Sequence, residues 1–136
     1  MTISLSHCFL IVRDYEEALG FYRDVVGLEV RNDVSFEGSR WLTLGAPDQP
    51  GVELGLEIPG YFPHTSAEDK QATADLLAKG LLPGLIFLTD NCDKTFEKIR
   101  DSGADVLQEP IDQPYGVRDC AFRDPSGNMV RFSQAK

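Results

Sequence analysis

Two stretches of sequence that repeat one pattern decide the fold: VRDYEEALGFYRDVVGLEV at residues 12–30 and LTDNCDKTFEKIRDSGADV at residues 88–106. A constant shift of 76 residues, from 12 to 88, superposes them without a gap and places Asp14 on Asp90. Few identities survive, but the polar, apolar and glycine positions agree throughout. Internal self-similarity of this kind indicates that one structural unit occurs twice in the chain.

Each copy carries the signals of a helix that follows a short apolar run. Asp14 and Asp90 stand where an N-cap residue belongs, and an acidic residue follows each of them three positions later. These groups satisfy the free N–H groups of a first helical turn and interact favourably with its dipole. Gly27 and Gly103 stand where a glycine in the left-handed conformation ends a helix. Each copy is therefore predicted to be a strand followed by a helix.

The pieces after each helix have the composition of strands. In residues 52–58, apolar side chains alternate with Glu53, Gly55 and Glu57, so a strand here would place both carboxylates on one face. Both copies are thus predicted to be β-α-β-β-β modules. Two such sheets around a shared hollow would direct Glu53, Glu57 and Arg131 toward that hollow. The predicted strands are Phe9–Val12, Leu28–Asn32, Arg40–Leu44 and Val52–Ile58, then Leu85–Leu88, Asp105–Leu107, Val117–Arg123 and Met129–Gln134.

A length of 136 residues fits one domain. We predict a single domain over 1–136, with module one at 1–58, a connecting segment at 59–82 and module two at 83–136. The connecting segment is predicted to contain a helix over Ala67–Lys79, opened by a capping box from Thr65 to Glu68 and ended by Gly80. We interpret it as a connection, with a lid over a pocket as the alternative.

Composition excludes several classes of function. Acidic residues outnumber basic ones by 22 to 13, and the formal charge of −9 opposes a phosphate backbone and suits a cationic partner. No apolar run approaches the length of a membrane span, and Met1–Leu10 lacks the features of a signal peptide. We expect a cytoplasmic protein that binds neither nucleic acid nor membrane. Three widely spaced cysteines, Cys8, Cys92 and Cys120, indicate neither a disulfide framework nor a structural zinc site.

The sequences HCFLIVRDYEEALGFYRDVVGLEV near the start and YGVRDCAFRDPSGNMVRFSQ at the end resemble the vicinal oxygen chelate superfamily. That group includes glyoxalase I, bleomycin-resistance proteins, fosfomycin-resistance enzymes and extradiol dioxygenases. The resemblance covers nearly the whole chain, and Pro59–Leu82 matches least. Its most specific pieces are the FY and GLEV of residues 21–30 and the DPSGN turn at Asp124–Asn128. It implies an α+β, glyoxalase-like fold, in which paired β-α-β-β-β modules form a cupped mixed sheet around a cleft, commonly in a homodimer.

The same resemblance implies where a metal would bind. In metal-dependent members, side chains from equivalent strands of both modules hold a divalent ion; here His7 matches the first position and the next falls near Glu53. In the second module the corresponding positions are Gly84 or Pro83, and then Arg131. Catalytic zinc generally needs three protein ligands, and a guanidinium stays charged and would repel the ion. We therefore expect no metal cofactor, with Zn, Ni, Fe or Mn at His7 and Glu53 as the alternative.

The candidate ligand-binding residues combine aromatic walls with a few polar groups, as small-molecule pockets do. Arg131 can hold a carboxylate or phosphate through two hydrogen bonds, or it can pair with Glu53 across the cleft. The predicted site residues are His7, Trp41, Glu53, Tyr115, Arg118 and Arg131.

We expect a metal-free homodimer that binds a small organic molecule in the cleft between its modules, as bleomycin-resistance proteins do. One alternative is a glyoxalase-like lyase or isomerase, or a dioxygenase-type enzyme. It would use a divalent metal or acid–base catalysis at His7 and Glu53, which are then the candidate catalytic residues. Another alternative is a dimeric scaffold with a vestigial pocket.

Overall fold

A computed structural model describes residues 1–135. Each module has the predicted order of elements, and an additional helix connects the two modules. Module one contains β1 (His7–Ile11), α1 (Tyr15–Leu19), η1 (Gly20–Val26), β2 (Glu29–Phe36), β3 (Ser39–Gly45) and β4 (Glu53–Glu57). After the connecting helix α2 (Ala67–Ala78), module two contains β5 (Leu85–Leu88), α3 (Cys92–Asp101), β6 (Asp105–Asp112), β7 (Val117–Arg123) and β8 (Met129–Ala135).

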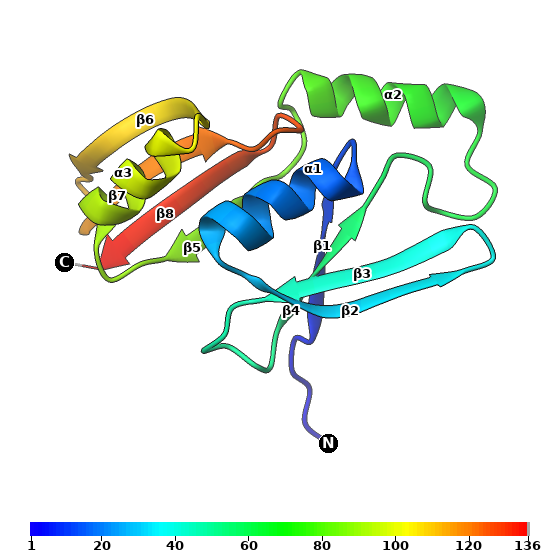
Figure 1. Cartoon of the computed structure of the whole chain (residues 1–136), viewed down its shortest axis with the longest axis horizontal. Helices are drawn as coiled ribbons and strands as arrows, with labels where there is room; N and C mark the ends of the chain where they lie inside the picture. The colour runs from blue at the N-terminus through cyan, green and yellow to red at the C-terminus, as the bar shows by residue number, and fades with distance from the viewer. Residues whose placement is uncertain (136) are drawn as a thin grey trace.

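The strands form two separate four-stranded mixed sheets, ordered β1-β4-β3-β2 and β5-β8-β7-β6. In each sheet the first strand of the module runs parallel to the last, and the remaining neighbours are antiparallel. Figure 1 shows the two modules side by side, with α2 along the upper edge. The matching strand order confirms the predicted α+β class with two β-α-β-β-β modules.

The helices begin one residue away from two of the predicted cap residues. Asn91, and not Asp90, is the N-cap of α3, because its side chain accepts the Lys94 N–H at 3.0 Å. Likewise Ser66, and not Thr65, is the N-cap of α2, since it accepts the Asp69 N–H at 3.0 Å. In both cases two adjacent residues are good N-caps. The sequence could not distinguish them, and the two predictions were wrong by one position.

The first helix has one residue more than its counterpart between its N-cap and the glycine that follows it. Asp14 is its N-cap, as predicted, and accepts the Glu17 N–H at 2.8 Å. Gly27 ends the helix with φ 96°, one residue further from its N-cap than Gly103 is from Asn91. The additional residue is accommodated in η1, a π-helical turn, which is the usual structural result of a single insertion in an α-helix. The gapless superposition of the two copies therefore fails over part of the repeat.

The helix-facing sides of the two sheets share one hydrophobic core. The Tyr22 hydroxyl, which is fully buried, donates a 2.6 Å hydrogen bond to Asp124 in the turn before β8. The side-chain amide of Asn128 in the same turn donates to the backbone oxygen of Ile11 at 2.8 Å. These bonds join module two to the start of module one. The core residues include Leu10, Leu19, Phe21, Leu42, Leu56, Phe96, Ile99, Phe122, Val130 and Phe132.

The connecting helix α2 packs on little of the protein, since Leu77 is its one buried residue. Its C-terminal end is fixed to module two. A Cβ atom on Gly127 would meet the Leu77 carbonyl oxygen at 2.7 Å, so the turn and the helix end are in close contact. Gly80 ends the helix with φ 71°, as predicted for a left-handed stop residue. Within residues 1–135, no helix combines the length and the apolar character needed to cross a membrane.

Candidate functional site

The side of the first sheet that faces away from the helices carries a cluster of rings. We call this side the first open face. Because side chains alternate along a strand, His7, Phe9 and Trp41 lie here, whereas Leu10 and Leu42 enter the core. The His7 and Trp41 ring centroids are 5.6 Å apart, and those of Phe9 and Trp41 are 6.0 Å apart. Phe9 is 49% exposed and Trp41 is 42% exposed, so this aromatic surface is open to a ligand.

A fixed carboxylate lies beside the rings. Glu53 accepts hydrogen bonds from the Thr43 hydroxyl at 2.6 Å and from the Asn32 amide at 3.0 Å. These bonds, the first above all, lower the pKa of Glu53, so the carboxylate is charged over a wide pH range. The His7 Nε2 atom lies 3.7 Å from the same Glu53 oxygen. The structure therefore brings together three predicted site residues: His7, Trp41 and Glu53.

The corresponding side of the second sheet, which we call the second open face, carries a guanidinium. Arg131 donates to Gln108 at 2.9 Å and lies 3.2 Å from the buried carboxylate of Asp119. Burial acts to raise the pKa of Asp119, but hydrogen bonds from Gln113 and Gln108 and the charge of Arg131 lower it overall. The hydroxyl of Tyr115, a predicted site residue, contacts Asp119 at 3.3 Å. The ion pair with the buried Asp119 carboxylate thus holds the Arg131 side chain in place.

The two open faces do not pair with each other within one chain. Among residues 1–135, no ion pair joins Glu53 to Arg131, and each of these residues is bonded within its own sheet. The predicted pairing across a cleft is therefore absent from the single chain. Ile86 and Leu88, on the second open face, are 67% and 86% exposed. Both open faces therefore have apolar side chains that are exposed to solvent in the single chain.

Arg118 lies apart from the other predicted site residues. It neighbours Asp119 on β7, so its side chain projects to the opposite side of the sheet, toward α3. There its guanidinium contacts Asp93 at 2.8 Å and Asp112 at 3.2 Å. Hydrogen bonds to these two aspartates raise the pKa of Arg118 above its ordinary value. The contacts link α3 and β6 to β7. Its role in a ligand site stays a sequence prediction that the geometry does not favour.

The register of the strands tests whether these residues fit a metal. His7 lies opposite Glu53, but Arg131 lies opposite Ile86, which is two residues beyond Gly84. By strand register, the first-module counterpart of Arg131 is therefore Gly55 and not Glu53. A Cβ atom on Gly55 would meet the Phe9 ring at 2.5 Å, so this ring covers the position.

The residues consequently do not fit a metal centre. A Cβ atom on Gly84 would overlap the Met129 carbonyl oxygen, so no donor side chain can stand at that position. No group of three His, Cys, Asp or Glu side chains within the described residues is placed to hold an ion. His7 and Glu53 alone fall short of the three ligands of a catalytic zinc site.

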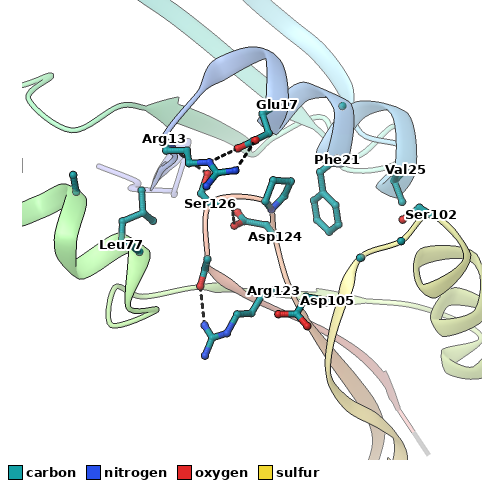
Figure 2. A pocket seen from close by; sticks show the side chains of 17 residues that line it. Arg13, Glu17, Phe21, Val25, Leu77, Ser102, Asp105, Arg123, Asp124 and Ser126 are labelled. Carbon is teal, nitrogen blue, oxygen red and sulfur yellow. Dashed lines mark hydrogen bonds and ion pairs between the residues drawn. The ribbon is translucent and has the colours of Figure 1, made fainter.

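A cavity of about 630 Å³ lies elsewhere, between the first helix, α2 and the turn before β8. Figure 2 shows Phe21, Leu77 and Asp124 around it. Arg13 pairs with Glu17 at 2.7 Å, and Asp124 accepts bonds from Tyr22, Asn128 and two backbone N–H groups. Because these charges already have partners, we interpret this cavity as the junction of the modules and not as the ligand site.

Two residues of the site were missed at the level of sequence. Phe9 lies two positions after His7 on the same strand, so strand alternation alone could have placed it beside the predicted site residue. Asp119 could not be predicted as a site residue, because nothing in the sequence shows that the side chains of Gln108 and Gln113 donate hydrogen bonds to it.

The paired β-α-β-β-β modules and their open faces define a glyoxalase-like protein. The chain belongs to the Glyoxalase/Bleomycin resistance protein/Dioxygenase superfamily, whose sequence model matches residues 4–132. UcmS2 has a crystal structure that is similar to this chain with a TM-score of 0.89 and 36% identity, covering 98% of each chain. TnmS3, an antibiotic binding protein from Streptomyces sp. CB03234, is similar with a TM-score of 0.77 and 27% identity, covering 100% of this chain and 99% of TnmS3. The lactoylglutathione lyase of Salmonella typhimurium is 27% identical over 97% of this chain and 93% of its own length.

Proposed function

We propose that this protein binds a small organic molecule with an aromatic portion, without a metal cofactor. The observation that carries the proposal is the exposed cluster of His7, Phe9 and Trp41 beside the fixed carboxylate of Glu53. Rigid aromatic side chains supply a large contact area and lose little conformational entropy when a ligand packs on them. The similarity to TnmS3, an antibiotic binding protein, supports an antibiotic-like ligand.

We infer that a second copy of the chain completes the site. The first open face carries the carboxylates of Glu53 and Glu57, and on the second open face the guanidinium of Arg131 is paired with Asp119, so a ligand between the two faces would meet polar groups on both sides. Both also expose apolar side chains, as interaction surfaces do. In the proposed homodimer, the first open face of one copy lies across the ligand from the second open face of its partner. Tyr115 and Arg131 then form the far wall.

The lowered pKa of Glu53 favours a binding function over acid–base catalysis. Its lowered pKa makes the carboxylate a weak proton acceptor, whereas a general base works best with a pKa near the working pH. A proton-transfer enzyme remains the second candidate function, and two observations favour it. His7 Nε2 lies 3.7 Å from Glu53, and the chain is similar to a lactoylglutathione lyase.

The test uses Trp41, the one tryptophan of the chain, whose fluorescence reports on the first open face. Aromatic antibiotics are screened by thermal shift, and compounds that raise the melting temperature are titrated against the fluorescence. We expect Phe9→Ala to weaken binding by about tenfold or more. Leu81→Ala, an exposed apolar control outside both open faces, should leave binding unchanged.

Absence of any binder, or binding that is indifferent to Phe9, would contradict the proposal. Chemical turnover of a bound compound that is lost in His7→Ala and Glu53→Gln would support the enzyme instead.

A further inference from the structure

A second, smaller cavity of about 370 Å³ adjoins the first open face. It lies between the start of α1, the β2–β3 turn and the segment that follows β4. Three of its walls are aromatic: Tyr15, Trp41 and Tyr61. Its acidic wall is Glu57, which lies on β4 two positions after Gly55 and therefore on the same face as Glu53. Trp41 connects this cavity to the ring cluster.

Glu57 is the unusual group in this cavity. The residue is 9% exposed, and among residues 1–135 its carboxylate has no hydrogen-bond or ion-pair partner. A buried charged group is normally paired, because removal from water is costly when nothing compensates it. Burial accordingly raises the pKa of Glu57, and the nearby carboxylate in turn contributes to the raised pKa of Tyr15 and of Tyr61. Within residues 1–135 no buried side-chain oxygen lacks a hydrogen-bond partner, so the Glu57 oxygens are not enclosed by protein and reach the cavity, where a cationic ligand can contact them.

The cations that line the cavity do not supply that partner. Arg40 is held by Asp33 at 2.9 Å and by Glu16 at 3.0 Å, and its guanidinium lies over the Tyr15 ring. Lys70 rests its methylene groups against Gly60, and within the described residues no ion pair joins it to Glu57. The protein thus presents a free carboxylate inside a partly closed cavity.

We propose that this cavity receives the ammonium group of an amine-bearing aromatic ligand, with Glu57 as its counter-ion. Aromatic walls attract organic cations through the negative faces of their rings, which suits an alkylammonium group. A metal ion fits less well, because the cavity offers one carboxylate and no cluster of three donors among the described residues. The inference rests on the function proposed above, since Trp41 belongs to both sites, and it adds the chemical class of the ligand.

The test compares two probes of the same shape that differ in charge: 4-biphenylmethylammonium and the neutral 4-biphenylmethanol. Each is titrated against the intact protein, with Trp41 fluorescence and calorimetry as readouts. We expect the ammonium to bind about tenfold more tightly than the alcohol. Glu57→Gln should abolish this preference, while Glu97→Gln, an exposed acid on α3, should retain it. Thermal melts verify that both variants fold.

The outcomes separate the two proposals. Equal affinity of the two probes for the unchanged protein would overturn the role of Glu57 and leave the aromatic binding site standing. An ammonium preference that persists in Glu57→Gln would also overturn it, because the cation would then bind elsewhere. If neither probe binds, the inference fails, whereas the proposed function fails only if the screen of aromatic antibiotics also yields no binder. Even if a variant is unstable, equal affinity of the two probes for the unchanged protein overturns the role of Glu57.

Discussion

Two glutamates on one strand should respond in opposite directions to the same substitution. Glu57 is 9% exposed and within residues 1–135 its carboxylate has no protein partner, although its oxygens are not fully enclosed, whereas Glu53 is bonded to Thr43 and Asn32. Glu57→Gln removes a buried charge and keeps the shape of the side chain. Leaving a buried polar group unsatisfied costs about 1–3 kcal/mol, and more when the group is charged. Because the Glu57 oxygens are only partly removed from water, we expect Glu57→Gln to raise the free energy of unfolding by about 1 kcal/mol at neutral pH, the lower end of that range.

The pH dependence gives the sign of each effect. The pKa of Glu57 is raised in the folded protein, so its contribution to stability is largest in acid and is lost as pH rises through that raised pKa. The gain from Glu57→Gln should therefore grow between about pH 4 and pH 7. The pKa of Glu53 is lowered, so its contribution is present at neutral pH and is lost as pH falls. Glu53→Gln should destabilise at neutral pH, and its effect should shrink in acid.

Urea denaturation at a series of pH values measures both effects, with the variants and the unchanged protein compared at each pH. A chain of this size should show a melting-temperature change of roughly 3–5 °C for each 1 kcal/mol. The result that refutes this reasoning is a neutral or destabilising Glu57→Gln whose effect does not vary with pH. In that case the Glu57 carboxylate would be well solvated or paired, and it would not favour a cation in the cavity.

Three further changes test the fold around the site by urea denaturation. Tyr22→Phe removes the bond to the buried Asp124 and should lower the free energy of unfolding by about 1.5–3 kcal/mol. Gly84→Ala forces a Cβ atom against the Met129 carbonyl and should cost about 1–3 kcal/mol. Asn91→Ala removes the N-cap of α3 and should cost about 1 kcal/mol.

Matched controls make these changes specific. Gly51→Ala introduces a methyl group into open space and should change stability by less than about 0.5 kcal/mol. Asp90→Ala should have an equally small effect, because Asp90 does not cap α3. A larger loss in Asp90→Ala than in Asn91→Ala would contradict the assigned cap. Unchanged stability in Tyr22→Phe would show that the bond between the modules contributes nothing.

Much of the fold could be predicted because its signals are local. The run at residues 85–88 and the strand at residues 117–123 were predicted with their observed bounds, since each is apolar and ends at turn residues. β2 extends to Phe36, well beyond the predicted Asn32, because it pairs with β3 through a turn at Glu37 and Gly38. Both turn residues have positive φ, which glutamate seldom adopts, so the sequence did not signal this hairpin.

The candidate site was predictable where it depends on one strand and not where it depends on several. His7 and Glu53 follow from the pattern of the repeat and its resemblance to a family. The environment of Glu57 could not be predicted in this way, because Tyr15 and Tyr61 line the same cavity as Glu57 only in the folded chain. Similarly, Gly55 emerged as the counterpart of Arg131 only from the register of the strands. The alignment by sequence had pointed to Glu53.

The central claim is that each ligand site is shared between two copies of the chain. Mixing two variants, each defective in one open face, tests this claim most directly. Trp41→Ala damages the first open face, and Tyr115→Ala removes the exposed aromatic ring from the second. If each site combines the first face of one copy with the second face of its partner, a mixed dimer of the two variants contains one intact site. We predict that mixing restores binding of 4-biphenylmethylammonium at one site per mixed dimer, although neither variant binds it alone. No restoration in verified mixed dimers would contradict a site shared between two copies.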